Sequence, residues 1–119
     1  MHTILVIEDQ PIMRQKTVTI LKMEGYEVLE AADGRDALGK LDGRKIHLII
    51  SDVNMPNMDG IELLSNLKAN PSYKTVPVLM VTTEGSQAKV MQALELGAVG
   101  YVRKPFTAEE IKGKLTGII

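Results

Sequence analysis

Five short apolar segments, each followed by a helical pattern, run along the whole chain and constrain its fold more than any other feature. The segments cover residues 3–7, 27–31, 47–52, 78–82 and 100–103. Their length is typical of strands, whereas the stretches between them carry apolar residues at helical spacing. Strands that alternate with helices form a parallel sheet with helices on both faces. The sequence therefore predicts an α/β fold, a doubly wound three-layer sandwich around a five-stranded parallel sheet.

Turn and capping residues mark the expected ends of the helices. The expected helices run from Pro11 to about Glu24, from Asp33-Gly34 to Asp42-Gly43, from about Gly60 to Ala69, from Gly85-Ser86 to Gly97, and onward from the N-cap Thr107. In the fourth helix, the spacing predicts that Met91 and Leu94 face the core. In the fifth, Glu110 stands three residues after Thr107, which is the spacing of a capping box.

The expected strands differ in hydrophobicity, and this difference predicts their order. The first, third and fourth are continuous apolar runs, as is typical of central strands covered on both faces. The second carries Glu30 and the fifth is short, so both are expected at the edges. The order 2-1-3-4-5 satisfies these constraints. In this order the chain reverses direction between the first and third strands, and ligands bind outside the carboxyl ends of the strands at such a point.

Composition excludes several classes of function. A chain of 119 residues corresponds to about one domain, so residues 1–119 are expected to form a single domain. The absence of cysteine excludes disulfides, thiolate metal sites and a cysteine nucleophile. A net charge of -1 without a basic run argues against direct binding of nucleic acid. Because no apolar segment approaches the roughly 20 residues of a membrane helix, and because the N-terminus leads directly into a strand, we expect a cytoplasmic protein.

Polar and charged residues follow four of the expected strands. Glu8 and Asp9 follow the first, Asp52 ends the third, Thr82 ends the fourth, and Lys104 follows the fifth. Carboxylates gathered in one crevice need a proton or a cation between them, and Mg²⁺ with oxygen ligands and a phosphate fits best. An aspartate can itself attack phosphorus and form an aspartyl phosphate. Roles in turns, caps and surface charge remain the alternative at this point.

Four separated motifs together resemble a known family. The motifs Glu8-Asp9, Ser51 to Gly60 (SDVNMPNMDG), Thr82 and Lys104-Pro105-Phe106 are similar to those of the receiver domain of bacterial two-component response regulators, in particular the single-domain chemotaxis type. The resemblance covers essentially the whole chain and leaves no remainder for an output domain. It implies a flavodoxin-like fold. The strand order 2-1-3-4-5 is already established for chemotaxis receivers, so agreement with it is not independent support.

The resemblance implies roles for the residues at the strand ends. Asp52 would accept a phosphoryl group from a histidine kinase, and Lys104 would contact the phosphoryl oxygens. Mg²⁺ would be held by Glu8, Asp9, Asp52 and the backbone carbonyl of Asn54. Glu8 stands where many members of the family have Asp. The resemblance also implies a cis peptide bond between Lys104 and Pro105.

The resemblance further implies a switch and a partner surface. Thr82 would bond to the phosphorylated aspartate while Tyr101 turns inward, and Asn54 and Glu84 would tune the rate of phosphoryl loss. Their identities favour a short-lived phosphorylated state. The fourth helix, fifth strand and fifth helix would meet partners through Val90, Tyr101, Arg103 and Lys114. Arg103 replaces a residue that is usually apolar in the chemotaxis protein.

The expected protein is a monomeric signalling receiver that catalyses only its own phosphorylation and dephosphorylation. Its downstream partner would be a flagellar motor switch protein, a histidine phosphotransfer protein in a relay, or another protein docked on the same face. Two other classes are disfavoured. A flavodoxin-like cofactor binder needs a phosphate-cradling loop where Glu8-Asp9 would repel phosphate. A Mg²⁺-dependent phosphohydrolase using Asp52 needs a substrate pocket or cap domain, for which the chain offers no obvious insertion.

Overall fold

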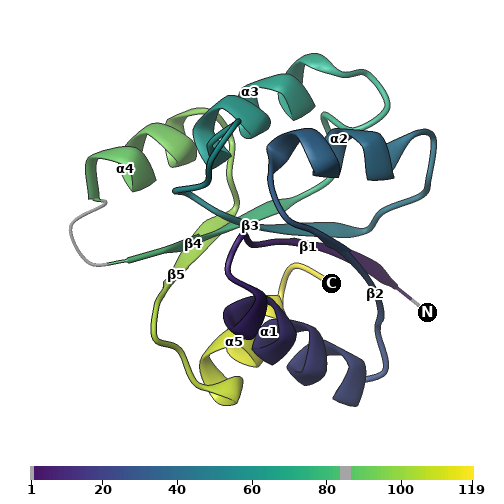
Figure 1. The fold of residues 1–119 in the computed structure, drawn as a ribbon, viewed down its shortest axis with the longest axis vertical. Helices are drawn as coiled ribbons and strands as arrows, with labels where there is room; N and C mark the ends of the chain where they lie inside the picture. Colours follow the sequence, from purple (N-terminus) through teal and green to yellow (C-terminus); the bar gives the residue numbers. More distant parts are fainter. Residues whose placement is uncertain (1, 84–86) are drawn as a thin grey trace.

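Strands and helices alternate along the chain as the sequence predicts (Figure 1). The computed structural model describes residues 2–83 and 87–119. The strands are β1 (Thr3–Ile7), β2 (Glu27–Ala31), β3 (Leu48–Asp52), β4 (Val78–Thr82) and β5 (Gly100–Arg103). The helices are α1 (Pro11–Met23), α2 (Gly34–Leu41), α3 (Gly60–Ala69), α4 (Gln87–Glu95) and α5 (Ala108–Leu115). Of these helices, none combines the length and the apolar character needed to cross a membrane.

The five strands form one parallel sheet in the order β2-β1-β3-β4-β5, so the predicted order is confirmed. β1 pairs with β2 on one side and with β3 on the other. After β1, the chain therefore adds β2 on one side of β1 and then crosses back to add β3 on the other side. This reversal places the loops after β1 and β3 next to each other at the carboxyl edge of the sheet.

Alternating side chains of the strands enter two separate cores, one on each face. Ile4 and Val6 of β1 pack on the face covered by α1 and α5, whereas Leu5 and Ile7 pack on the face covered by α2, α3 and α4 (Figure 1). The strands β1, β3 and β4 are buried on both faces, which explains why their sequences are continuously apolar. The sheet is thus the rigid middle layer from which the loops at its carboxyl edge project.

Proline, glycine and capping residues mark the ends of the helices, as the sequence predicts. Pro11 occupies the first turn of α1, where a missing N–H costs no hydrogen bond. Gly25 and Gly97, which follow α1 and α4, have φ angles of 90° and 105°, a backbone conformation that favours glycine. At the start of α5, Thr107 and Glu110 form the predicted capping box. These ends fix where the neighbouring strands can begin.

The predicted inward face of α4 is wrong. Met91 and Leu94 are 55 % and 37 % exposed, and Val90 and Ala93 are buried in their place. Apolar residues stand on both sides of this helix, so the spacing alone does not fix its rotation. The two smaller side chains face inward, and the two larger ones lie outside. The predicted start of this helix, Gly85-Ser86, lies outside the described residues.

Candidate functional site

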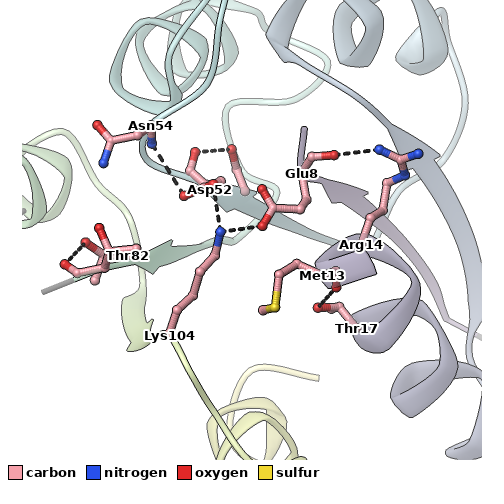
Figure 2. A network of polar contacts seen from close by, with 10 residues as sticks. Glu8, Met13, Arg14, Thr17, Asp52, Asn54, Thr82 and Lys104 are labelled. Carbon is pink, nitrogen blue, oxygen red and sulfur yellow. Dashed lines mark hydrogen bonds and ion pairs between the residues drawn. The ribbon is translucent and has the colours of Figure 1, made fainter. Parts of the chain in front are cut away.

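Two acidic side chains and one lysine meet at the carboxyl edge of the sheet (Figure 2). Glu8 follows β1 and Asp52 ends β3, and both side chains are almost fully buried. Lys104 follows β5, and its amino group donates to Asp52 Oδ2 at 2.9 Å and to Glu8 Oε1. The contact with Glu8 joins residues 96 positions apart in the sequence. The fold therefore brings together the charged strand ends that the sequence singles out.

Asp9 completes a cluster of three carboxylates. One oxygen from each of Glu8, Asp9 and Asp52 lies within 4.8 Å of the others. Asp9 is only partly buried, and the second carboxylate oxygen of Glu8 is buried and has no hydrogen-bond partner among residues 2–83 and 87–119. A buried oxygen without a partner is costly unless a cation or water is bound to it. The donor set consists of hard oxygen ligands, so it fits Mg²⁺ in kind.

The pKa values in the cluster follow from burial and mutual contact. The pKa of Glu8 is raised to about 7, chiefly by burial and also by contact with Asp52, while contact with Lys104 partly offsets the rise. Burial alone would lower the pKa of Lys104, but its hydrogen bonds to Glu8 and Asp52 outweigh burial and raise it above its usual value. Lys104 is therefore a fixed positive charge at neutral pH, while Glu8 is poised between its two protonation states.

The turn between β3 and α3 holds Asp52 at the edge. Its backbone closes through a hydrogen bond from Gly60 N–H to Val53 O at 2.8 Å. A Cβ atom at Gly60 would overlap the carbonyl oxygen of Asp52 and lie 2.8 Å from Met80 Cε, so only glycine fits this approach. Asn54 also lies beside the aspartate, because its backbone N–H reaches Asp52 Oδ1 at 3.4 Å. The loop thus packs tightly around the carboxylate.

The predicted switch residues lie on β4 and β5, beside this cluster. Thr82 is buried, and its hydroxyl donates to Thr83 O at 3.1 Å (Figure 2). Tyr101 is 38 % exposed, and the amino group of Lys114 lies 5.8 Å from the centre of its ring. Glu84, the second predicted turnover residue, lies outside the described residues. The predicted cis bond between Lys104 and Pro105 is present.

A groove between α4 and β5 joins the switch residues to the surface. It is lined by Thr82, Thr83, Gln87, Val90, Met91, Leu94, Tyr101 and Arg103. Val90 is only 5 % exposed, so it lies at the floor of the groove rather than on the open face. Tyr101 and Arg103 are exposed at its rim. Met91 and Leu94, predicted to be core residues, line the groove instead.

Sequence reasoning missed two residues that contact the site. Arg14 on α1 donates to the backbone carbonyl of Glu8 at 2.8 Å (Figure 2). Its side chain also donates to Glu30 Oε1 at 3.2 Å. Lys89 on α4 donates to Asn54 Oδ1 at 2.9 Å. Neither residue forms part of a motif with its partner, and the contacts arise only from the packing of α1 and α4 on the sheet. No local sequence signal could have revealed them.

Comparison with known proteins gives the same family for almost the whole chain. Residues 4–116 match the response regulator receiver domain. Chemotaxis protein CheY1 of Helicobacter pylori (strain J99) is 40 % identical over 118 residues, which are 98 % of this chain and 95 % of that protein. Chemotaxis protein CheY-3 of Vibrio cholerae is 39 % identical over 116 residues, which are 97 % of this chain and 89 % of that protein.

Solved structures agree with the sequence matches. The structure of chemotaxis protein CheY4 of Vibrio cholerae superposes with a TM-score of 0.93 at 39 % identity, over 100 % of this chain and 99 % of that one. A putative response regulator from Chloroflexus aurantiacus gives a TM-score of 0.93 at 32 % identity, over 98 % and 96 % of the two chains. The chain therefore belongs to the response regulator receiver family and is a receiver domain of the CheY-like type.

Proposed function

We propose that this chain is a phosphoacceptor of two-component signalling, in which Asp52 takes a phosphoryl group from a histidine kinase in the presence of Mg²⁺. One observation carries the proposal. A buried carboxylate at the end of a central strand is hydrogen-bonded to a fixed ammonium group and lies in a cluster with two more carboxylates. This arrangement combines a nucleophile, a cation site and an anion contact at the point of the sheet where ligands bind.

Each group in the cluster has a role in the proposed reaction. Glu8, Asp9, Asp52 and the backbone carbonyl of Asn54 would hold the ion, which when bound neutralises charge on the phosphoryl oxygens. The carboxylate of Asp52 attacks the phosphorus of a phosphohistidine. The new P–O bond forms as the P–N bond breaks, and the electron pair returns to the imidazole. Lys104, already in hydrogen-bond contact with Asp52, is placed to compensate the charge of the transferred group.

The proposed switch transmits this change to the groove between α4 and β5. The Thr82 hydroxyl, which now donates to Thr83 O, would instead donate to the phosphoryl group. Tyr101 would then move inward from its half-exposed position. Both residues line the groove, so their movement would alter the surface offered to a partner. Asn54 and Glu84 would tune the loss of the phosphoryl group.

We further propose that the partner surface consists of the groove together with α5, with Tyr101, Arg103 and Lys114 exposed and Val90 beneath them. The similarity to chemotaxis proteins favours a flagellar motor switch protein as the target. A histidine phosphotransfer protein is the second candidate, because the charged Arg103 lies on the rim of the groove and gives the face a different character from an apolar one.

Intact mass spectrometry tests the proposed chemistry. The protein is incubated with Mg²⁺ and acetyl phosphate beside an Asp52→Asn variant. The expected result is one phosphoryl adduct that requires Mg²⁺, decays after removal of the donor and is absent from the variant. An adduct that forms equally on the Asp52→Asn variant, or no adduct on the wild-type protein, would refute the proposal.

A further inference from the structure

A lysine on the helix beside the site is bound to the loop that carries the phosphoacceptor. Lys89 lies in the first turn of α4, and its amino group donates to Asn54 Oδ1 at 2.9 Å. Asn54 stands two residues after Asp52, and its backbone N–H contacts the carboxylate at 3.4 Å. Within the described part of the chain, Lys89 forms no ion pair with a carboxylate. The carboxamide of Asn54 is therefore the partner that the structure gives to this ammonium group.

The nature of the donor fixes the orientation of the Asn54 side chain. An ammonium group donates hydrogen bonds and cannot accept them, so it selects the oxygen end of the carboxamide. The oxygen of Asn54 is accordingly held on the side of α4. Rotation of the carboxamide by 180° would place its NH₂ group against the ammonium, where two donors would face each other. Lys89 thus acts as a clamp on one of the two ends of the Asn54 side chain.

The orientation of this carbonyl bears on the lifetime of an aspartyl phosphate. In hydrolysis, a water oxygen bonds to phosphorus while the bond from phosphorus to the Asp52 oxygen breaks. The aspartate keeps the electron pair, and both protons of the water leave with the phosphate, which departs as dihydrogen phosphate. A side-chain oxygen at the mouth of the site can accept a hydrogen bond from that water and align it. An oxygen already engaged by a cation is a weaker acceptor, and the cation also stabilises a nearby dianion.

We propose that Lys89 is a positioning residue that holds the carbonyl of Asn54 on the side of α4 and thereby prolongs the phosphorylated state. The inference rests on the proposed function of Asp52 and goes beyond it, because it assigns the control of lifetime to a residue of α4. The neighbouring residues Val90 and Met91 line the groove, so the clamp belongs to the same helix as the partner surface.

The decay of the phosphorylated protein tests this role. Each protein is phosphorylated with acetyl phosphate and Mg²⁺, the donor is removed, and the adduct is followed by intact mass. We expect Lys89→Met to shorten the half-life about 3- to 10-fold, the size of effect expected from one charge-assisted hydrogen bond at an exposed position. Lys89→Arg keeps a cationic donor and should retain most of the wild-type half-life. The rate of adduct formation should change less than the rate of its loss.

A double-mutant cycle separates positioning from a general effect on α4. Lys89→Met should have no further effect when Asn54 is already alanine, because the clamped group is then missing. Lys45→Met is a matched control, since it removes an exposed lysine from the loop before β3, at the opposite edge of the sheet. An unchanged half-life for Lys89→Met, or an equal acceleration in the Asn54→Ala background, would overturn the inference. Failure of the wild-type protein to form any adduct would instead refute the proposed function on which it rests.

Discussion

Single residues at the carboxyl edge of the sheet carry opposing charges at very short range. Lys104 is in hydrogen-bond contact with two of the three clustered carboxylates, Glu8 and Asp52. Even beside this ammonium group, the second oxygen of Glu8 is buried without a hydrogen-bond partner in the part of the chain that the structure describes. The cluster is therefore incompletely compensated in the absence of a metal ion. Two measurable consequences follow, one for the dependence of stability on pH and one for the affinity for Mg²⁺.

The first consequence concerns the protonation of Glu8. Its pKa is raised from 4.5 to about 7 in the folded protein, chiefly by burial, so the native state binds this proton more tightly than the unfolded state does. The free energy of unfolding should therefore fall as the pH rises from about 4.5 through about 7 in the absence of divalent metal. Relative to Glu8→Gln, the wild-type protein should lose roughly 1–3 kcal/mol across this window.

Urea denaturation at several pH values, with chelator present, checks this difference. Glu27→Gln serves as the control, because Glu27 is exposed on the edge strand β2 and lies away from the cluster. A constant difference between wild-type protein and Glu8→Gln from pH 5 to pH 8 would show that the burial of Glu8 has no energetic effect.

The second consequence concerns competition between Lys104 and a metal ion. The ammonium group of Lys104 contacts two of the carboxylates whose oxygens would hold Mg²⁺. It therefore repels the ion and competes with it for these oxygens. Replacing Lys104 by Met should tighten Mg²⁺ binding roughly 3- to 10-fold at pH 8, where Glu8 is ionised. The same variant should accept a phosphoryl group from acetyl phosphate at least about 10-fold more slowly, because the compensating charge is lost.

Isothermal titration with MgCl₂ and the rate of adduct formation measure these two effects separately. Lys45→Met again provides the control for the loss of one positive charge. Weaker Mg²⁺ binding by Lys104→Met would mean that the lysine supports the metal site instead of competing with it.

At the scale of whole elements, the turn between β3 and α3 depends on close contact between backbones. Gly60 begins α3, and its N–H closes the turn onto Val53 O. Asp59 caps the same helix by accepting a hydrogen bond from Glu62 N–H at 2.9 Å. The strand that presents Asp52 and the helix that packs beneath it are therefore joined by a turn with no space for a side chain at position 60. The packing of α3 and the placement of Asp52 therefore depend on the same turn.

Two glycine substitutions test this close approach. Gly60→Ala places a Cβ atom against the Asp52 carbonyl and within 2.8 Å of Met80 Cε, so it should lower the free energy of unfolding by about 2 kcal/mol or more. Gly39→Ala, in the exposed part of α2, meets no atom within 4 Å and should raise it by about 0.5–1 kcal/mol. Chemical denaturation measures both. Equal effects of the two substitutions would contradict the proposed role of Gly60.

At the scale of the whole molecule, the site connects strands that the chain visits far apart. Glu8 and Asp9 follow β1, Asp52 belongs to β3, and Lys104 follows β5. The two cores pack on opposite faces of the same strands. A ligand that binds the loops after β1 and β3 in the folded state, and finds no such site in the unfolded chain, should stabilise the entire domain.

Thermal unfolding with and without Mg²⁺ measures this coupling. At a Mg²⁺ concentration of 100 times its dissociation constant, the domain should gain about 2.7 kcal/mol, seen as a higher midpoint temperature. NaCl at matched ionic strength should not reproduce the shift, and Asp9→Asn should reduce it. A shift of equal size in the Asp9→Asn variant would show that Mg²⁺ acts elsewhere on the molecule.

The order of the elements, and the residues that gather at the carboxyl edge of the sheet, follow from the sequence alone. Continuous apolar runs mark central strands, glycine and proline mark helix ends, and Glu8, Asp52 and Lys104 stand at the ends of strands. Because a parallel sheet brings all its carboxyl ends to one edge, these local facts suffice to predict that the three side chains meet. The capping box at Thr107 is equally local and is confirmed.

The rotation of α4 and the contacts between elements distant in the sequence depend instead on how the layers pack. Val90 and Met91 are both apolar, so hydrophobicity does not decide which of them faces the core. That depends on how closely α4 packs against the sheet. The bond from Lys89 to Asn54 and that from Arg14 to Glu8 join side chains on helices to loops that follow other strands. Such contacts leave no periodicity and no motif in the sequence, because the residues meet only once the layers have packed.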